Sequence, residues 1–196
     1  MRVIAGKYRG HTLRSLPGKD TRPTSDRLRE TLFNVLTSGN PAALEGTVWL
    51  DLFAGTGAIG IEALSRGAQQ VFFLETSARA AKVIEQNLQS LKIMDRYRIL
   101  RDDLSAVLWR LQREHIAADV VFLDPPYHMQ NAYEQTLTAL SESSLVWAMS
   151  LVIAEHEKKF DPEAEYGSLR RVRKLTQGNS ALSFYRIGGR PDLNDK

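Results

Sequence analysis

The sequence has no cysteine, and this absence removes several classes of function at once. No disulfide framework, Cys-ligated zinc site, iron–sulfur cluster or thiol nucleophile can be built, and such a chain fits a reducing compartment. Long apolar runs are also lacking: the longest, Leu145 to Ala154, has ten residues, whereas a membrane span needs about 20. The N-terminus lacks the apolar stretch of a signal peptide. We therefore expect a cytoplasmic protein that makes no membrane contact.

Metal-site patterns are missing too, since the four histidines are scattered without paired ligand spacing. What is present is ordinary for one folded domain with a short extension: 196 residues, 43% hydrophobic and 25% charged. Charge is uneven, because residues 1–30 carry +5 and the remaining residues carry −2. A basic N-terminal segment indicates a polyanionic partner, or it only keeps the protein soluble. Charge alone leaves both interpretations open.

Hydrophobic periodicity predicts alternating strands and helices from residue 48 onward. This order predicts an α/β fold with a Rossmann-like, doubly wound, mostly parallel sheet. We expect a C-terminal antiparallel hairpin and, before the sheet, a small hairpin and a helix capped by Thr24 or Ser25. The domain boundaries expected are 1–40 for the basic extension, 41–190 for the α/β domain and 191–196 for a tail. The strands are expected at 48–52, 71–75, 98–101, 120–123 and 145–154, the helices at 58–66, 77–91, 104–114 and 130–142, and the hairpins at 2–15 and 170–187.

A glycine-rich turn follows the first expected strand, in the stretch from Asp51 to Gly60. Its G-x-G-x-x-G spacing is a weak signal alone, and a tight turn would also need small residues. Its place between a strand and a helix, with Glu75 ending the next strand, favours a nucleotide-type ligand whose ribose Glu75 holds. Asp51 precedes the turn, and a carboxylate there suits an ammonium or sulfonium better than a pyrophosphate. S-adenosylmethionine carries both of these cations.

The fourth expected strand runs into Asp124-Pro125-Pro126-Tyr127. In a doubly wound sheet this strand ends beside the first one, across the ligand crevice. Two prolines fix two φ angles and remove two N–H donors, which leaves a rigid turn that presents acceptors beside an aromatic ring. The Asp124 carboxylate and the Pro125 carbonyl can accept both hydrogens of an exocyclic amine while Tyr127 stacks on its ring. The alternative is a rigid turn with an exposed tyrosine.

These features together resemble the class I S-adenosylmethionine-dependent methyltransferases that act on exocyclic amino groups. The stretch from Arg22 to Asn34, with Arg2 to Gly6 and the overall length, is similar over the whole chain to the bacterial 16S ribosomal RNA guanine-N2 methyltransferase D family. The resemblance implies S-adenosyl-L-methionine as methyl donor, S-adenosyl-L-homocysteine as product and no metal. It implies methylation of one guanine of 16S rRNA, either naked or within the small ribosomal subunit or an assembly intermediate. Apart from this resemblance, we expect a monomer.

The expected functional residues fall into three groups. The cofactor contacts are Asp51, Phe53, Ala54, Gly55, Thr56, Gly57, Glu75, Asp103 and Leu104, with Asp103 preferred over Asp102 because Leu108 then falls in register. The catalytic group is Asp124, Pro125, Pro126 and Tyr127, and the RNA contacts are Arg2, Lys7, Arg9, Arg14, Arg22 and Arg27. The basic run from Arg170 to Lys174 either protects an edge strand or contacts RNA.

Other functions stay open at this point. The same turn would serve adenine N6, cytosine N4 or a protein glutamine, although the basic segment argues against a protein substrate. The glycine spacing alone would also fit a nicotinamide-dependent oxidoreductase. A non-catalytic RNA-binding assembly factor is the third class, and it predicts no methyl transfer at all.

Overall fold

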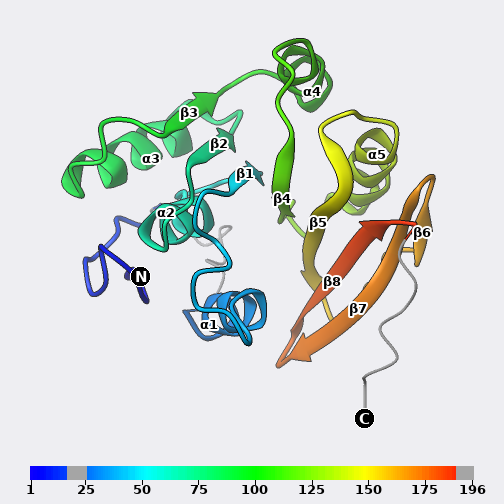
Figure 1. Ribbon diagram of the computed structural model, residues 1–196, viewed down its shortest axis with the longest axis horizontal. Coiled ribbons are helices and arrows are strands. Elements are labelled where there is room, and N and C mark those ends of the chain that lie inside the picture. The colour runs from blue at the N-terminus through cyan, green and yellow to red at the C-terminus, as the bar shows by residue number, and fades with distance from the viewer. Residues whose placement is uncertain (17–25, 189–196) are drawn as a thin grey trace. The chain divides into compact units, whose positions relative to one another are not determined.

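The computed structural model describes residues 1–16 and 26–188 (Figure 1). They form two compact units, one from Met1 to Asp102 and one from Asp103 onward. We describe each unit by itself. Thr24 and Ser25, the expected cap of the first helix, lie outside the described residues.

The first unit contains three parallel strands in the order β3-β2-β1. Leu50 of β1 pairs with Phe72 of β2, which in turn pairs with Arg98 of β3. Apolar side chains dominate β1 and β2, as expected for strands that are buried on both faces. The strands are β1 (Val48–Leu52), β2 (Gln70–Leu74) and β3 (Tyr97–Leu100).

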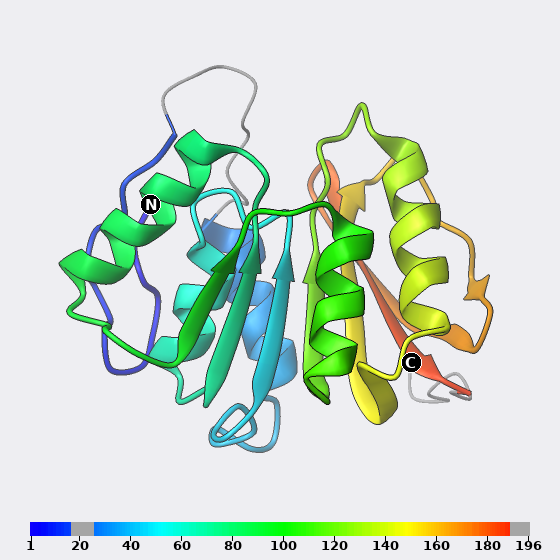
Figure 2. The same ribbon diagram turned by 90° about the horizontal axis from the view of Figure 1, so that it is seen from above.

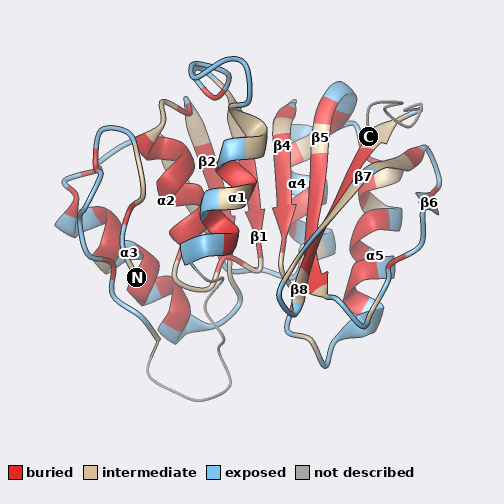
Figure 3. Cartoon of the chain, turned by 90° about the horizontal axis from the view of Figure 1, so that it is seen from below, coloured by how far each residue is buried: buried red, intermediate tan, exposed pale blue. Residues whose placement is uncertain are grey.

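Three helices cover one face of this sheet, α1 (Asp26–Leu36), α2 (Ala58–Ser65) and α3 (Ala78–Ser90) (Figure 3). All eight residues of α2 are buried, whereas α1 shows buried and exposed faces. Such full burial means that α2 has protein on every side. The helix α3 starts at Ser77, whose hydroxyl accepts the Ala80 N–H.

The second unit has the strand order β4-β5-β8-β7-β6. The pair β4–β5 is parallel, and the last three strands are antiparallel. The helices α4 (Leu104–Arg113) and α5 (Gln130–Ser141) lie on one face of these strands (Figure 2). The strands are β4 (Ala118–Leu123), β5 (Val146–Glu157), β6 (Glu165–Tyr166), β7 (Leu169–Gln177) and β8 (Ser180–Ile187).

The expected α/β order with a C-terminal antiparallel hairpin is confirmed. Several element ends shift by one or two residues, and three local differences are larger. The strand β5 continues to Glu157, because Glu155 and His156 are buried and pair with β8. The two-residue strand β6 has no sequence pattern and was not expected. The N-terminal hairpin is reduced to a single antiparallel bridge between Arg2 and Thr12.

None of the helices within residues 1–16 and 26–188 is long and apolar enough to cross a membrane.

Candidate active site and RNA-binding arm

The turn after β1, from Phe53 to Gly57, is called the Gly-rich loop below. Its backbone is unusual, with positive φ at Phe53 (63°), Gly55 (56°) and Gly57 (75°). A bulky residue at positive φ is strained and persists only where its surroundings hold it. Here the Ala54 N–H donates to the Leu74 carbonyl at 3.0 Å, and the Gly57 N–H donates to the Ala54 carbonyl at 2.7 Å.

The three glycines of the fingerprint serve different purposes. A Cβ at Gly60 would lie 2.3 Å from Phe73 Cε1, so this glycine allows α2 to pack closely on β2. A Cβ at Gly57 would lie 3.1 Å from Ile84 Cγ2. A Cβ at Gly55 would meet only a carbonyl at 4.0 Å. Gly55 is therefore the glycine whose outer side is open to a ligand.

Asp51 lies buried at the end of β1, and its carboxylate points to the start of α2. Its Oδ2 accepts the Gly60 N–H at 2.9 Å, one of the amides that a helix N-terminus leaves unpaired. Burial raises the pKa of Asp51 from 3.8 to about 8; the Gly60 hydrogen bond opposes the rise and the nearby Glu75 charge adds to it. The position where a dinucleotide fold binds pyrophosphate is thus occupied by a carboxylate.

Glu75 follows β2 and holds the Gly-rich loop in place. Its Oε2 accepts the Gly55 N–H at 2.8 Å, and its Oε1 accepts the Ser77 N–H at 2.8 Å. Each carboxylate oxygen has a second acceptor site, so these two bonds leave capacity for hydroxyl donors. Glu75 can therefore shape the loop and hold a ribose at the same time.

Asp103 and Leu104 begin α4 in the second unit. The Asp103 Oδ1 accepts the Ala106 N–H at 2.9 Å, so this exposed acid caps the helix. The expected contact of Asp103 with the cofactor stays a prediction.

The turn from Asp124 to Tyr127 follows β4. Pro125 is buried, and the Pro126 carbonyl accepts the Met129 N–H at 2.7 Å, which closes the turn onto α5. The Tyr127 hydroxyl lies 3.4 Å from Ser180 Oγ on β8. The turn is therefore fixed through Pro126 and Tyr127, and Asp124 and Tyr127 are half-buried.

Tyr133 of α5 lies behind this turn, and sequence reasoning missed it. Its hydroxyl donates to the Glu155 carbonyl at 2.8 Å, and its ring packs on Phe160 at 5.0 Å between centroids. Burial raises the pKa of Tyr133, and the charge of Asp124 raises it further. Tyr133 therefore stays neutral beside the Asp124 carboxylate. A single tyrosine on an apolar helix face gives no signal in sequence for such a position.

Residues 1–16, called the N-terminal arm below, are docked through their main chain. Glu62 of α2 accepts the Ile4 N–H at 2.7 Å and the Ala5 N–H at 2.9 Å. Ser65 accepts the Tyr8 N–H at 3.0 Å and donates to the Ala5 carbonyl at 2.5 Å. The arm is thus a fixed part of the first unit.

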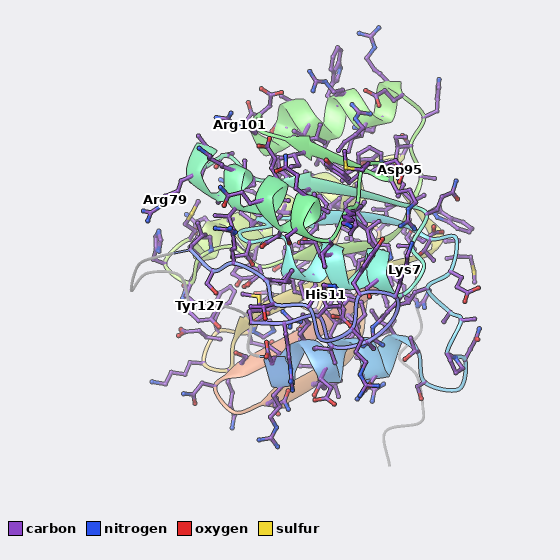
Figure 4. The ribbon with its side chains drawn as sticks, turned by 90° about the vertical axis from the view of Figure 1, so that its left-hand side faces the viewer. Lys7, His11, Arg79, Asp95, Arg101 and Tyr127 are labelled. Atoms are coloured by element: carbon purple, nitrogen blue, oxygen red, sulfur yellow. The ribbon has the colours of Figure 1, made fainter. Side chains whose placement is uncertain are left out.

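The basic side chains of the arm stay exposed although its backbone is fixed, and Figure 4 labels Lys7 on this segment. Arg29 is different, because it is fully buried and its guanidinium donates to the Arg2 carbonyl and to Asp26. Arg22 lies outside the described residues. The exposed cations among the expected RNA contacts are Arg2, Lys7, Arg9, Arg14 and Arg27.

The described residues gather no group of three or more His, Asp or Glu side chains with the geometry of a metal site.

Comparison with known proteins identifies the family. Residues 1–186 match the family described as Conserved hypothetical protein 95. The ribosomal RNA small subunit methyltransferase D of Haemophilus influenzae is 39% identical over 158 residues, covering 81% of this chain and 79% of the relative. The enzyme of the same name from Escherichia coli is 33% identical over 157 residues, covering 80% and 75%.

Solved structures agree with this. The Escherichia coli protein yhhF, provisionally named a methyltransferase, superposes with a TM-score of 0.79 at 30% identity, covering 95% of this chain and 97% of that one. The resemblance to methyltransferases that the sequence motifs indicated is confirmed. The chain has the class I methyltransferase fold and belongs to the Conserved hypothetical protein 95 family, together with the ribosomal RNA small subunit methyltransferases D.

Proposed function

We propose that this protein transfers the methyl group of S-adenosylmethionine to the exocyclic N2 amine of a guanine in 16S rRNA. The observation that carries the cofactor assignment is the pair of carboxylates at the Gly-rich loop. Asp51 occupies the N-terminus of α2, and Glu75 holds Gly55. Two acidic side chains favour a cationic ligand, which would keep the buried Asp51 ionised, and they disfavour a pyrophosphate. This argues against a nicotinamide-dependent oxidoreductase.

The residues present fit S-adenosylmethionine. Gly55 leaves an open side on the loop, Glu75 has acceptors for ribose hydroxyls, and Asp51 is a buried acid that a cation would keep ionised. When bound, S-adenosylmethionine supplies a methyl group on a sulfonium, which is an excellent leaving group. The protein then has to bind and orient the amine, and positioning supplies much of the catalysis.

Asp124, Pro125 and Tyr127 are proposed to hold the base. The lone pair of an exocyclic amine is delocalised into its ring, which makes it a poor nucleophile. Accepting both N–H bonds, at the Asp124 carboxylate and the Pro125 carbonyl, turns that lone pair toward the methyl group. The Asp124 charge also stabilises the positive charge that the amine gains in the transition state. The fixed turn supports this role, because pre-placed groups need no rearrangement during the reaction.

The N-terminal arm is proposed to bind the RNA. Its docked backbone and exposed cations form a pre-organised basic surface, which lowers the entropy cost of binding a polyanion. The names of the relatives support a small-subunit rRNA substrate, and the resemblance alone suggests guanine N2. We place the reaction in the cytoplasm and assign it to a monomer.

Radiolabelled methyl transfer tests the proposal. The protein is incubated with labelled S-adenosylmethionine and with unmethylated small ribosomal subunits, naked 16S rRNA or DNA, and the labelled nucleoside is identified by chromatography. We expect N2-methylguanosine from an RNA substrate. Labelled N6-methyladenosine or N4-methylcytidine would move the target to another base. Transfer to none of these substrates would overturn the proposal and favour an assembly factor or a protein substrate.

A further inference from the structure

Asn87 is a fully buried polar side chain on the inner face of α3, and it contacts two functional segments at once. Its Oδ1 accepts the Arg14 N–H at 2.7 Å. Its Nδ2 donates to the Arg14 carbonyl at 3.2 Å and to the Thr56 carbonyl at 3.0 Å. One amide group therefore joins the end of the N-terminal arm to the middle of the Gly-rich loop.

These contacts fix the orientation of the amide. Its oxygen faces an N–H group and its nitrogen faces two carbonyls, so the opposite orientation would break every bond. The same loop residue meets the arm a second time, because the Thr56 hydroxyl lies 3.7 Å from Met1 Sδ. The first and last parts of the arm thus both reach Thr56, one directly and one through Asn87.

We propose that Asn87 is a positioning residue that couples RNA binding on the arm to cofactor binding at the Gly-rich loop. The inference rests on the proposed function for the identity of the two ligands. A cofactor that orders Thr56 also orders Asn87, which is hydrogen-bonded to it. The arm then loses less conformational entropy when it binds RNA, because Asn87 is already held in place. Coupling between two binding sites is reciprocal, so RNA on the arm raises cofactor affinity by the same factor.

Ser65 provides a matched control, because its side chain also makes two hydrogen bonds to the main chain of the arm. Unlike Asn87, it bonds to the arm from α2, and within the described residues its side chain makes no hydrogen bond to the Gly-rich loop. Asn87→Ala and Ser65→Ala therefore both loosen the arm, but only Asn87→Ala removes the link to Thr56. A purely structural role of Asn87 predicts the same behaviour for both variants.

The experiment measures the dissociation constant of labelled S-adenosylhomocysteine by equilibrium dialysis, with and without saturating unmethylated small ribosomal subunits. For the wild type we expect the subunits to tighten binding by about 5- to 50-fold, within the usual range of allosteric coupling. Ser65→Ala should keep this ratio, whereas Asn87→Ala should bring it close to one. An unchanged ratio in Asn87→Ala, or a wild-type ratio of one when both ligands bind, overturns the inference.

Hydrogen exchange on the wild type keeps the inference testable if Asn87→Ala does not fold. Binding of the subunits should slow exchange at the Gly55 amide, which donates to Glu75, and at the Gly57 amide, which donates to the Ala54 carbonyl within the loop. Unchanged exchange there, with the arm protected, would overturn the coupling and leave the proposed function intact. Failure of the subunits and of naked 16S rRNA to bind would overturn the proposed function, and the inference with it.

Discussion

The Gly-rich loop and the Asp124–Tyr127 turn each follow a parallel strand, but they are built in opposite ways. The loop is rich in backbone N–H groups, and the side chains of Asp51 and Glu75 hold N–H groups at and just beyond it. The turn has lost two N–H groups to proline and is fixed through the Pro126 carbonyl and the Tyr127 hydroxyl. Acceptor side chains thus hold the N–H groups of the Gly-rich loop, whereas the Asp124–Tyr127 turn offers its own acceptors to a ligand. This difference matches a cationic cofactor at the loop and an amine at the turn.

Removal of the charged acceptor at the turn should have the largest effect. Asp124→Ala is expected to lower the single-turnover methyl-transfer rate by about 10²–10³-fold, by analogy with the loss of one oxyanion-hole donor. Asp124→Asn keeps an acceptor oxygen but loses the charge, so its single-turnover rate should lie between those of the wild type and Asp124→Ala. Both variants should bind cofactor and RNA nearly as the wild type does. A near-normal single-turnover rate in Asp124→Ala would refute the role assigned to the turn.

Tyr127 distinguishes stacking from hydroxyl chemistry in the same turn. Tyr127→Ala should lower the single-turnover rate at saturating RNA by about 10- to 100-fold, the usual value of one aromatic–base stack. Tyr127→Phe should be mild, because it keeps the stacking ring while it removes the 3.4 Å contact with Ser180. Ser180→Ala removes the same contact from the other side and serves as control. A strongly impaired Tyr127→Phe would show that the hydroxyl matters.

At the Gly-rich loop, Glu75→Ala should weaken cofactor binding rather than slow the methyl-transfer step. It removes the acceptor of the Gly55 and Ser77 amides and of the proposed ribose hydroxyls. Calorimetry with S-adenosylhomocysteine should show affinity reduced by about 10- to 100-fold, from the loss of bonds to a charged group. Glu85→Ala, at an exposed position of α3, is the control. Unchanged affinity in Glu75→Ala, with the fold intact by circular dichroism, would remove Glu75 from the cofactor site.

Asp51 should make stability depend on pH. Its pKa in the folded protein is about 8, raised from 3.8, so its stabilising contribution is complete below pH 4 and is lost as pH rises through 8. Asp51→Asn can keep the Gly60 bond but cannot ionise. The unfolding free energy of the wild type minus that of Asp51→Asn should fall by about 2 kcal/mol between pH 6 and pH 8.

Urea unfolding at several pH values measures this difference. A flat difference between the wild type and Asp51→Asn would mean that Asp51 is ionised in the empty protein.

The smallest expected change concerns the arm. Reversal of Arg9 and Arg14 to glutamate should weaken binding to unmethylated 16S rRNA and reduce the salt slope by about 2, because fewer counterions are released. Affinity for S-adenosylhomocysteine in the absence of RNA should not change. Reversal of Lys158 and Lys159, two exposed cations outside the arm, is the control. If the variant with Arg9 and Arg14 reversed keeps both the RNA affinity and the salt dependence of the wild type, the arm only keeps the protein soluble.

Much of the fold could be predicted from hydrophobic periodicity and from the glycine and proline residues that mark turns. The strand 48–52 and the helix α3 were predicted correctly, because apolar residues that recur with the period of a strand or a helix indicate a buried face. The extension of β5 through Glu155 and His156 could not be predicted, because buried polar residues imitate a loop. His156 is satisfied by Ser183 Oγ at 2.9 Å, a partner 27 residues away.

The side chains that hold the arm are polar residues within apolar helix faces, a pattern that can be interpreted only once the structure is known. Glu62 interrupts an otherwise apolar helix, and Asn87 lies within the apolar stripe of α3. A polar residue in such a position has a buried partner, but the pattern does not say which one. In both places the partner is main chain from the N-terminal arm, which has no periodicity of its own. Side-chain periodicity therefore could not reveal the docking.

Because the arm is attached through main-chain hydrogen bonds, its exposed side chains can be replaced without breaking these bonds. Glu62, Ser65 and Asn87 bind N–H and C=O groups that every residue except proline carries, so the outward side chains at positions 7, 9 and 14 take no part in the docking. Other positions of the arm must be kept, since Val3, Tyr8 and Leu13 are buried and a Cβ at Gly6 would lie 2.0 Å from the Ser65 carbonyl oxygen. A library randomised at those three positions, with Gly6 kept, would explore new RNA preferences on an unchanged scaffold.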